Sequence, residues 1–179
     1  MSRYFLDDSY YFITIPTFQR KVLFTDSQKK HLILQKIHEA IKKFSVKEVD
    51  YGILQNHYHI VALIQDGKVI PKFLQHINGG TSYAYQKIYG PLPDSAMWDE
   101  YHVYVAEKDE VLAKIRGYVM GNPLKHGEVK SLQALMTYPF SSYNQSTNKY
   151  GQKMVDEWIR SVIALDEDTF FSQLNKLPD

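Results

Sequence analysis

The spacing of apolar and polar positions predicts alternating strands and helices over the first two thirds of the chain. Runs rich in β-branched and aromatic residues predict strands at 10–16, 46–54, 57–64 and 98–107. Helical spacing predicts helices at 26–44, 71–90 and 110–123. The order strand, helix, strand, strand, helix, strand, helix favours an α+β sandwich, in which an antiparallel sheet has its helices packed on one face.

Local signals refine the boundaries of these elements. Thr25, Asp26 or Ser27 can cap the first helix, and Gln55-Asn56 can turn the chain between the second and third strands. The pair Gly79-Gly80 is expected to interrupt the second helix, where it marks a close approach of the backbone to a ligand, and Pro123 is expected to end the third. Beyond about residue 131 we expect a turn at YPFSSYN and one or two short helices.

Composition limits the chemistry that the chain can support. The 179 residues suit one domain with a short terminal appendage, and the absence of cysteine leaves only nitrogen and oxygen ligands for a metal. A net charge of +1 does not indicate a uniformly basic surface, although a local groove can still attract phosphate. No apolar run approaches the ~18 residues that span a bilayer, so we expect a cytoplasmic protein without membrane contact.

Two histidines stand out in the stretch LQNHYHIVALI. Side chains alternate along a strand, so His57 and His59 would point the same way, roughly 7 Å apart along the strand. Imidazoles so placed can share one metal ion. The alternative is a pair of ordinary surface residues on one face of the strand.

Three further motifs follow in order along the chain. WDEYHVYV precedes the third helix, GYVMGNPLKHG crosses its end, and PFSSY lies shortly beyond. Together with NHYHIVALI and the opening YFITIPTFQRKVLF, they resemble the HUH-type single-tyrosine transposases of bacterial insertion sequences. The resemblance is strongest to the REP-associated tyrosine transposases, and it covers roughly residues 10–143.

This resemblance implies a ferredoxin-like core that cuts single-stranded DNA beside a hairpin. It also implies a divalent metal, Mg²⁺ or Mn²⁺, held by His57 and His59, with Tyr58 facing the core. Tyr118 would be the nucleophile that forms a 5′-phosphotyrosine, and Asn122 would complete the metal site. Residues 1–143 would then form the nuclease domain and 144–179 a helical extension. Some relatives are dimers, whereas the REP-associated branch is typically monomeric, so the resemblance favours a monomer and leaves a dimer as the alternative.

Each of these residues also has a simpler interpretation. Tyr118 lies on an apolar helical stripe and could be a core tyrosine, and Asn122 before proline could simply end the helix. Tyr83 and Tyr85 are rival nucleophiles, although neither matches the family's pattern of tyrosine followed by asparagine and proline. The stretch NGGTSYAYQ also lacks the basic residue that often precedes its glycines in the family.

Basic and aromatic side chains suggest a path for DNA, because lysine and arginine contact phosphates and aromatic rings stack on bases. The candidates for DNA contacts are Arg20, Lys21, Lys72, Tyr83, Lys87, Trp98, Arg116 and Lys125. Two other functions remain open from the sequence. One is a DNA- or RNA-binding module of the same fold that has lost activity, and the other is a metallohydrolase that uses water and tolerates Tyr118→Phe.

Overall fold

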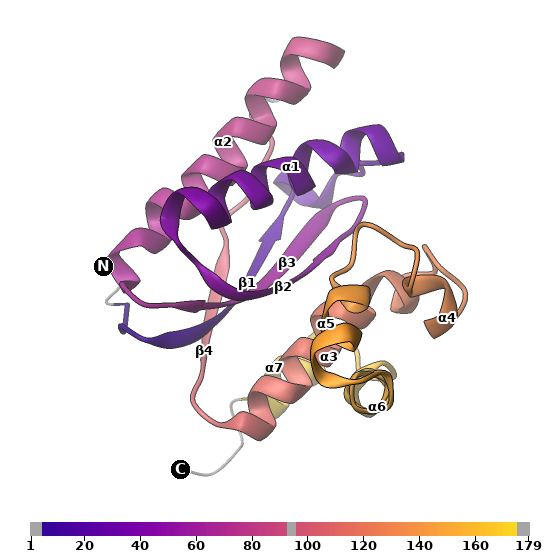
Figure 1. The fold of residues 1–179 in the computed structure, drawn as a ribbon. Helices are drawn as coiled ribbons and strands as arrows, with labels where there is room; N and C mark the ends of the chain where they lie inside the picture. The colour runs from indigo at the N-terminus through magenta and orange to yellow at the C-terminus, as the bar shows by residue number, and fades with distance from the viewer. Residues whose placement is uncertain (1–4, 93–95, 175–179) are drawn as a thin grey trace.

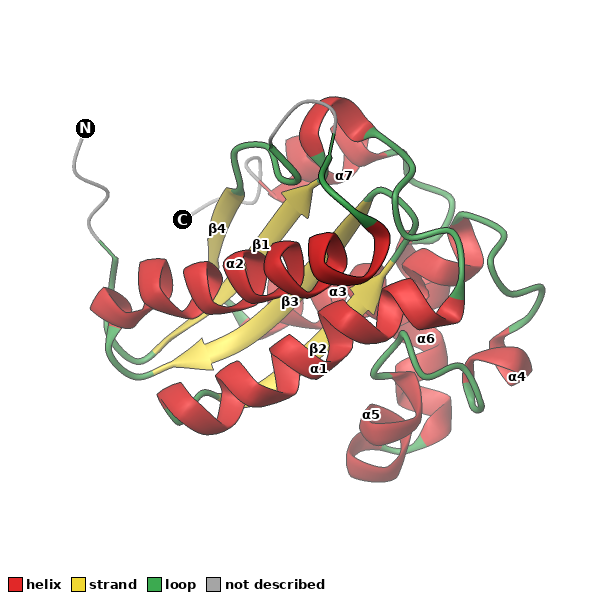
Figure 2. Ribbon diagram, turned by 90° about the horizontal axis from the view of Figure 1, so that it is seen from above, coloured by secondary structure: helices red, strands yellow, loops and turns green. Residues whose placement is uncertain are grey.

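A four-stranded antiparallel sheet forms the centre of the protein in the computed structural model, which describes residues 5–92 and 96–174. The spatial order is β2-β3-β1-β4, and each strand runs antiparallel to its neighbours (Figure 2). The strands are β1 (Ser9–Pro16), β2 (Lys47–Ile53), β3 (His57–Ile64) and β4 (His102–Ala106). With one helix after β1 and one after β3, this is the ferredoxin-like arrangement. The predicted α+β class is confirmed.

Helices cover both faces of the sheet, which corrects the expectation of a single covered face. On one face lie α1 (Ser27–Phe44) and α2 (Ile70–Tyr89), and on the other α3 (Asp109–Lys125) with the later helices (Figure 1). Asp26 is the cap of α1, since its side chain accepts a hydrogen bond from the Lys29 N–H at 3.0 Å. Two short 3-10 turns, η1 (Phe18–Arg20) and η2 (Gly67–Val69), follow β1 and β3.

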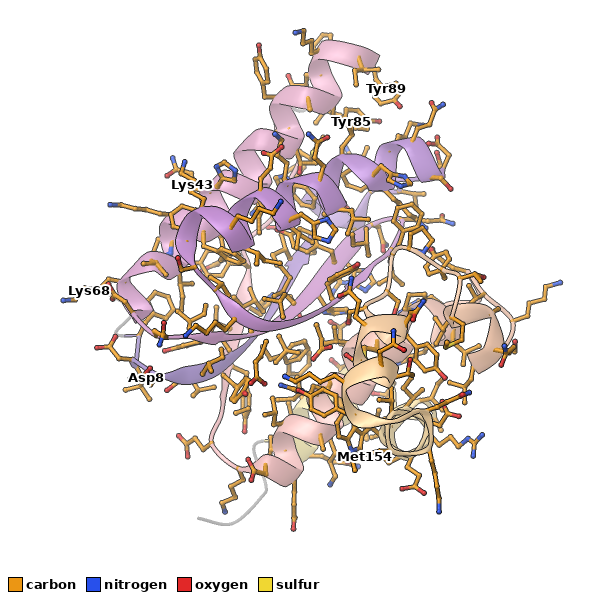
Figure 3. All side chains as sticks on the ribbon, in the orientation of Figure 1. Asp8, Lys43, Lys68, Tyr85, Tyr89 and Met154 are labelled. Carbon is orange, nitrogen blue, oxygen red and sulfur yellow. The ribbon has the colours of Figure 1, made fainter. Side chains whose placement is uncertain are left out.

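Side-chain alternation along the strands produces two hydrophobic cores. On β3, Tyr58 and Ile60 face α1 and α2, whereas Val61 faces α3. His57 and His59 share the orientation of Val61, so both imidazoles lie between the sheet and α3. Figure 3 shows side chains filling both of these layers.

Neither Gly79 nor Gly80 interrupts α2, which is continuous from Ile70 to Tyr89. A glycine within a helix costs only about 1 kcal/mol, which packing can offset. At Gly80 that packing is against α1, because an added Cβ would lie 2.9 Å from Cδ of Lys36. Gly80 thus allows α2 to approach the Lys36 side chain of α1 closely.

Pro123 does not end α3, which continues to Lys125. Proline has no N–H, so the carbonyl of Val119, four residues earlier, receives no helical hydrogen bond from it. That carbonyl lies against Gly52 of β2, where an added Cβ would be only 2.2 Å from the oxygen. Glycine at this position allows α3 to sit directly on the sheet.

The last third of the chain forms four helices in the part that the structure describes, more than the one or two expected. They are α4 (Leu132–Leu135), α5 (Tyr143–Tyr150), α6 (Gln152–Val162) and α7 (Glu167–Leu174). Their apolar faces join α3 in shared hydrophobic clusters. Among the described residues, no helix is both long enough and apolar enough to span a membrane.

Candidate active site

His57 and His59 lie side by side on β3, beneath α3. Their ring centroids are 4.7 Å apart, and the two side chains are 4% and 0% exposed. Burial lowers the pKa of His57 to about 3, with a smaller contribution from the nearby His126 ring. The pKa of His59 also falls well below its ordinary value, again chiefly through burial. Both imidazoles are therefore neutral at pH 7, the form that binds metals.

Each imidazole uses its Nδ1 atom for a contact within the protein. His57 Nδ1 donates to Oδ1 of Asn56 at 2.7 Å, because an amide oxygen can only accept. His59 Nδ1 lies 2.9 Å from Oγ1 of Thr14 on β1. When Nδ1 donates, Nε2 carries the lone pair that a metal needs. The two histidines are thus oriented as metal ligands commonly are.

Two buried polar atoms at this site have no hydrogen-bond partner among the described residues. They are Nε2 of His59 and Oδ1 of Asn122, and both side chains are 0% exposed. Leaving such atoms unpaired in a protein interior costs free energy, and a bound cation would satisfy both. Imidazole nitrogen and amide oxygen are suitable donors for manganese and acceptable ones for magnesium. The residues present therefore fit a divalent metal.

Tyr118 reaches the same place from α3. Its ring centroid is 5.4 Å from that of His59. Asn122 follows one helical turn later, and its Nδ2 donates to the Tyr118 carbonyl at 3.0 Å. The structure thus brings together the four residues that the sequence singled out: His57, His59, Tyr118 and Asn122. Asn122 lies inside α3 and does not end the helix.

Helix α7 covers the Tyr118 ring. Phe170 stacks on it with centroids 4.0 Å apart and planes 8° apart, and Tyr118 is only 3% exposed. Burial raises the pKa of Tyr118 to about 12, and the carboxylate of Glu167 adds to the rise. Glu167 also pairs with Arg20 at 3.3 Å. Local sequence patterns could not predict this contact, because Tyr118 and Phe170 are distant along the chain.

His126 is a further residue at the site that the sequence analysis did not select. Its ring centroid lies 5.4 Å from that of His57. The histidine in GNPLKHG, four residues beyond Asn122, was the available signal. Within the described residues, no three His, Asp or Glu side chains are arranged to hold one metal ion. A metal would therefore rest on the histidine pair and the Asn122 amide.

The candidate DNA contacts fall into separate groups. Arg20 and Lys125 lie near Tyr118, where the Lys125 ammonium is 4.9 Å from the tyrosine ring centroid. Lys21 is close in sequence to Arg20, and its ammonium lies 5.8 Å from the Phe18 ring. The other exposed candidates, Lys72, Tyr83 and Lys87, are on α2, across the sheet from the histidines. Tyr85 is 9% exposed and packs in the core.

Trp98 is partly exposed and engaged in the core, whereas Arg116 is buried. Trp98 stacks on Phe24 with centroids 5.5 Å apart, and its indole N–H donates to the Asn78 carbonyl at 3.0 Å. Arg116 is 4% exposed. Arg116 was expected to contact DNA phosphate, but its guanidinium is paired within the protein. The sequence alone does not reveal which charged side chains form such internal pairs.

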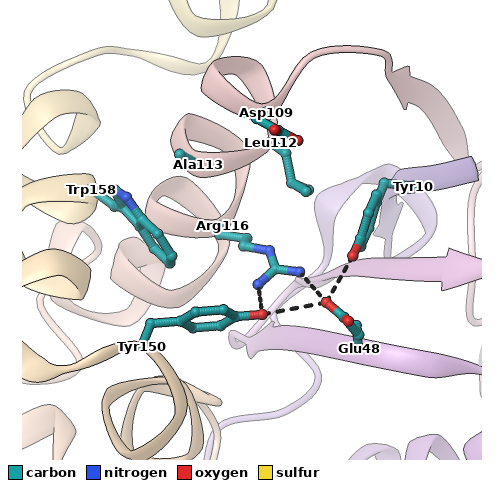
Figure 4. A pocket seen from close by; sticks show the side chains of 8 residues that line it. All are labelled: Tyr10, Glu48, Asp109, Leu112, Ala113, Arg116, Tyr150 and Trp158. Atoms are coloured by element: carbon teal, nitrogen blue, oxygen red, sulfur yellow. Dashed lines mark hydrogen bonds and ion pairs between the residues drawn. The ribbon is translucent and has the colours of Figure 1, made fainter.

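Arg116 instead joins β2, α3 and α5 through a polar network that is buried at Arg116 and Asp50 and exposed at Glu48. Its guanidinium contacts Glu48 at 3.1 Å and Asp50 at 3.5 Å, and it donates to the Tyr150 hydroxyl. Tyr10 adds a 2.7 Å hydrogen bond to Glu48. Figure 4 shows Arg116, Glu48, Tyr150 and Tyr10, which line a cavity of about 250 Å³ beside α3. The guanidinium lies against both tyrosine rings, so this aromatic site already holds a cation from the protein itself.

A comparison with known families identifies the chain's relatives. Residues 6–122 match the sequence profile described as "Transposase IS200 like". The chain belongs to the IS200-like transposase family. The matched range contains the histidine pair, Tyr118 and Asn122, and it ends at Asn122. No curated protein sequence matches this family member.

Solved structures share the fold of this transposase-family chain at low sequence identity. A REP-associated tyrosine transposase bound to a REP hairpin has a TM-score of 0.66 and 18% identity, covering 83% of this chain and 85% of that one. The tRNA(His) guanylyltransferase of Saccharomyces cerevisiae has a TM-score of 0.51 and 10% identity, with coverage of 97% and 82%. A putative transposase from Deinococcus radiodurans has a TM-score of 0.49 and 15% identity, with coverage of 66% and 94%.

Proposed function

We propose that this transposase-family protein cuts and rejoins single-stranded DNA beside a hairpin, with Tyr118 as the nucleophile. The observation that carries this proposal is the meeting of Tyr118, from α3, with the His57 and His59 pair from β3. A metallohydrolase that uses water would not need a tyrosine at this point. The hairpin substrate is proposed by analogy with the solved REP-associated relative, which is bound to such a hairpin.

The chemical step is the displacement of one DNA strand by the Tyr118 oxygen. The phenol loses its proton to solvent as its oxygen forms a bond to the phosphorus. The bond from phosphorus to the 3′-oxygen breaks, and that oxygen takes a proton from water. The 5′-phosphotyrosine so formed conserves the phosphodiester bond energy, so a 3′-hydroxyl can later reverse the step without ATP.

We further propose that His57, His59 and Asn122 hold a divalent metal, Mn²⁺ or Mg²⁺. When bound, the metal would compensate negative charge on the phosphate oxygens. Thr14 and Asn56 keep the imidazoles oriented through their Nδ1 contacts. Arg20 and Lys125 add positive charge near Tyr118, where the phosphate must bind.

All four site residues come from a single chain, which favours a monomer as the active unit. A dimer that exchanged its tyrosine helices would place Tyr118 away from its own histidines. We propose residues 1–143 as the nuclease domain and 144–179 as an extension, whose described part, up to residue 174, packs on α3. Size-exclusion chromatography with light scattering tests this monomer, and a stable dimer in solution would contradict it.

A denaturing protein gel tests the activity. The protein is incubated with labelled single-stranded hairpin DNA and manganese. A labelled band should appear with the parent protein and disappear with Tyr118→Phe, which should still bind the DNA. His57→Ala should also abolish the band, whereas the matched control His102→Ala, an exposed histidine on β4, should keep it.

The burial of Tyr118 favours one second candidate, a DNA- or RNA-binding module that has lost catalysis. A tyrosine that is 3% exposed and has a pKa near 12 is poorly prepared to attack. Hairpin binding without a covalent band, with either metal and with varied flanking sequences, would support this candidate and contradict the nuclease.

A further inference from the structure

Helix α7 places an aromatic ring directly on the tyrosine that a substrate would have to reach. Phe170 stacks on the Tyr118 ring with centroids 4.0 Å apart, and Tyr118 is only 3% exposed. A phosphate that Tyr118 attacks must come close to its hydroxyl oxygen. Because so little of the tyrosine is exposed, part of this cover has to move before a phosphate can bind there.

The same segment of the chain also engages two cations beside Tyr118. The Arg20 guanidinium pairs with the Glu167 carboxylate at 3.3 Å. The Lys125 ammonium donates to the Leu165 carbonyl, and it lies 4.9 Å from the centroid of the Tyr118 ring. A carboxylate and a carbonyl of the protein thus occupy the positive groups that a phosphate beside Tyr118 would use.

Helix α3, which carries Tyr118, is fixed on two sides by close backbone contacts. A Cβ added to Gly52 of β2 would lie 2.2 Å from the carbonyl oxygen of Val119. A Cβ added to Gly117 would lie 2.4 Å from the carbonyl oxygen of Trp158 on α6. Packing this close leaves a helix little freedom to shift. The element that can open the site is therefore α7 and not α3.

The contacts that hold α7 are weaker and can be replaced by DNA. Only Phe170 and Leu174 of this helix are buried. The side chains of the Arg20–Glu167 pair are 46% and 34% exposed, and exposed ion pairs contribute little to stability. Arginine binds phosphate through two parallel charge-assisted hydrogen bonds, which are stronger. A DNA strand at Arg20 can therefore offset the loss of Glu167.

We propose that α7 is a displaceable cover of the active site and that single-stranded DNA takes its place. A DNA phosphate replaces the Glu167 carboxylate at Arg20 and the Leu165 carbonyl at Lys125, and Phe170 leaves the Tyr118 ring. DNA binding thereby exposes the nucleophile. This inference rests on the proposed function, because the cover matters only if Tyr118 attacks DNA. The burial of Tyr118 then belongs to the DNA-free protein and does not indicate lost catalysis.

Hydrogen exchange measures the displacement of α7 without catalysis. Amide exchange is followed by mass spectrometry in the Tyr118→Phe protein with manganese, with and without single-stranded hairpin DNA at a concentration that saturates binding by fluorescence anisotropy. A bound ligand normally slows exchange, so faster exchange in one element reports its release. The amides of α7 should exchange about tenfold faster with DNA bound, whereas those of α6 should not become faster.

Phe170→Ala should loosen the cover in the absence of DNA. The variant lacks the ring that stacks on Tyr118, so a larger fraction of molecules is open and the rate of covalent adduct formation should rise about tenfold. Val162→Ala is the matched control, since Val162 of α6 is 1% exposed and lies in the same hydrophobic cluster. It should lower stability, measured by urea denaturation, without raising the adduct rate.

Either of two results would overturn the displaceable cover. One is amide exchange in α7 that is unchanged or slower when DNA saturates the Tyr118→Phe protein. The other is a folded Phe170→Ala protein that forms the covalent adduct no faster than the parent does. The failure of the nuclease proposal looks different, because neither the parent nor Phe170→Ala would then give a covalent band while α7 still exchanges faster with DNA bound.

Discussion

At the residue scale, the site depends on the orientation of two buried imidazoles. His59 has Nδ1 against the Thr14 hydroxyl and leaves Nε2 without a partner. Contacts of this kind fix the tautomer of a ligand and hold its ring in place, and their loss typically lowers metal affinity. Thr14 is therefore a positioning residue whose contribution can be measured apart from DNA cleavage.

Thr14→Val should weaken manganese binding by about 10- to 100-fold, because His59 loses the group that fixes its Nδ1 proton. The substitution preserves shape, so the fold should remain intact. Thr81→Val is the matched control, since Thr81 is also fully buried but its hydroxyl has no hydrogen-bond partner among the described residues. Isothermal titration with Mn²⁺ checks both variants. Unchanged manganese affinity in Thr14→Val would show that Thr14 does not position His59 for metal binding.

At the element scale, helix α3 is contacted by α7 on one side and joined to β2 and α5 on the other. Helix α7 covers Tyr118 through Phe170 and places Glu167 near it. On the other side, Glu48 of β2 meets Arg116 of α3 and Lys149 of α5. The first set of contacts affects reactivity, and the second affects stability.

Glu167→Gln should raise the rate of Tyr118 adduct formation by roughly two- to tenfold. Removing this carboxylate lowers the pKa of Tyr118, so the phenolate fraction rises at every pH below that pKa. The single-turnover rate should therefore reach a given value at lower pH than in the parent. Glu157→Gln, an exposed position on α6, is the control. A pH–rate profile identical to that of the parent would show that Glu167 does not influence the nucleophile.

Glu48 should make the fold sensitive to acid. The Tyr10 hydrogen bond, with the Arg116 and Lys149 contacts, lowers the pKa of Glu48 to about 2 from 4.5. Because the folded-state pKa is depressed, its stabilisation is present above pH 4.5 and is lost as the pH falls towards 2.

Glu48→Gln should therefore lose less free energy of unfolding than the parent between pH 6 and pH 3. Urea denaturation at each pH measures this difference. Glu157→Gln should follow the parent. Equal pH dependence in the parent and Glu48→Gln would contradict the assigned role of Glu48.

At the scale of the whole molecule, local patterns predicted the elements well and their packing less well. The histidine pair follows from strand alternation, and Tyr118 with Asn122 follows from one helical turn, so short-range spacing was enough for both. Only the family resemblance predicted that the histidine pair and the Tyr118–Asn122 pair belong to one site. Phe170 over Tyr118 and the internal pairing of Arg116 depend on contacts between distant segments, which periodicity cannot specify.

The second covered face of the sheet was missed for the same reason. Strand β3 has apolar side chains on both faces, a pattern typical of a strand that is covered on both sides. The pattern does not say which helices supply the second layer. The glycine pair in α2 was also misread, because a glycine weakens a helix locally while helix packing decides the outcome.

The most direct test of the central claim is to locate the DNA attachment within the chain. The covalent product is digested with nuclease and trypsin, and its peptides are sequenced by mass spectrometry. We predict a nucleotide on the tryptic peptide 117–125, attached to Tyr118. A nucleotide on peptide 73–87, which holds Tyr83 and Tyr85, would contradict the assignment, as would cleaved DNA with no modified peptide.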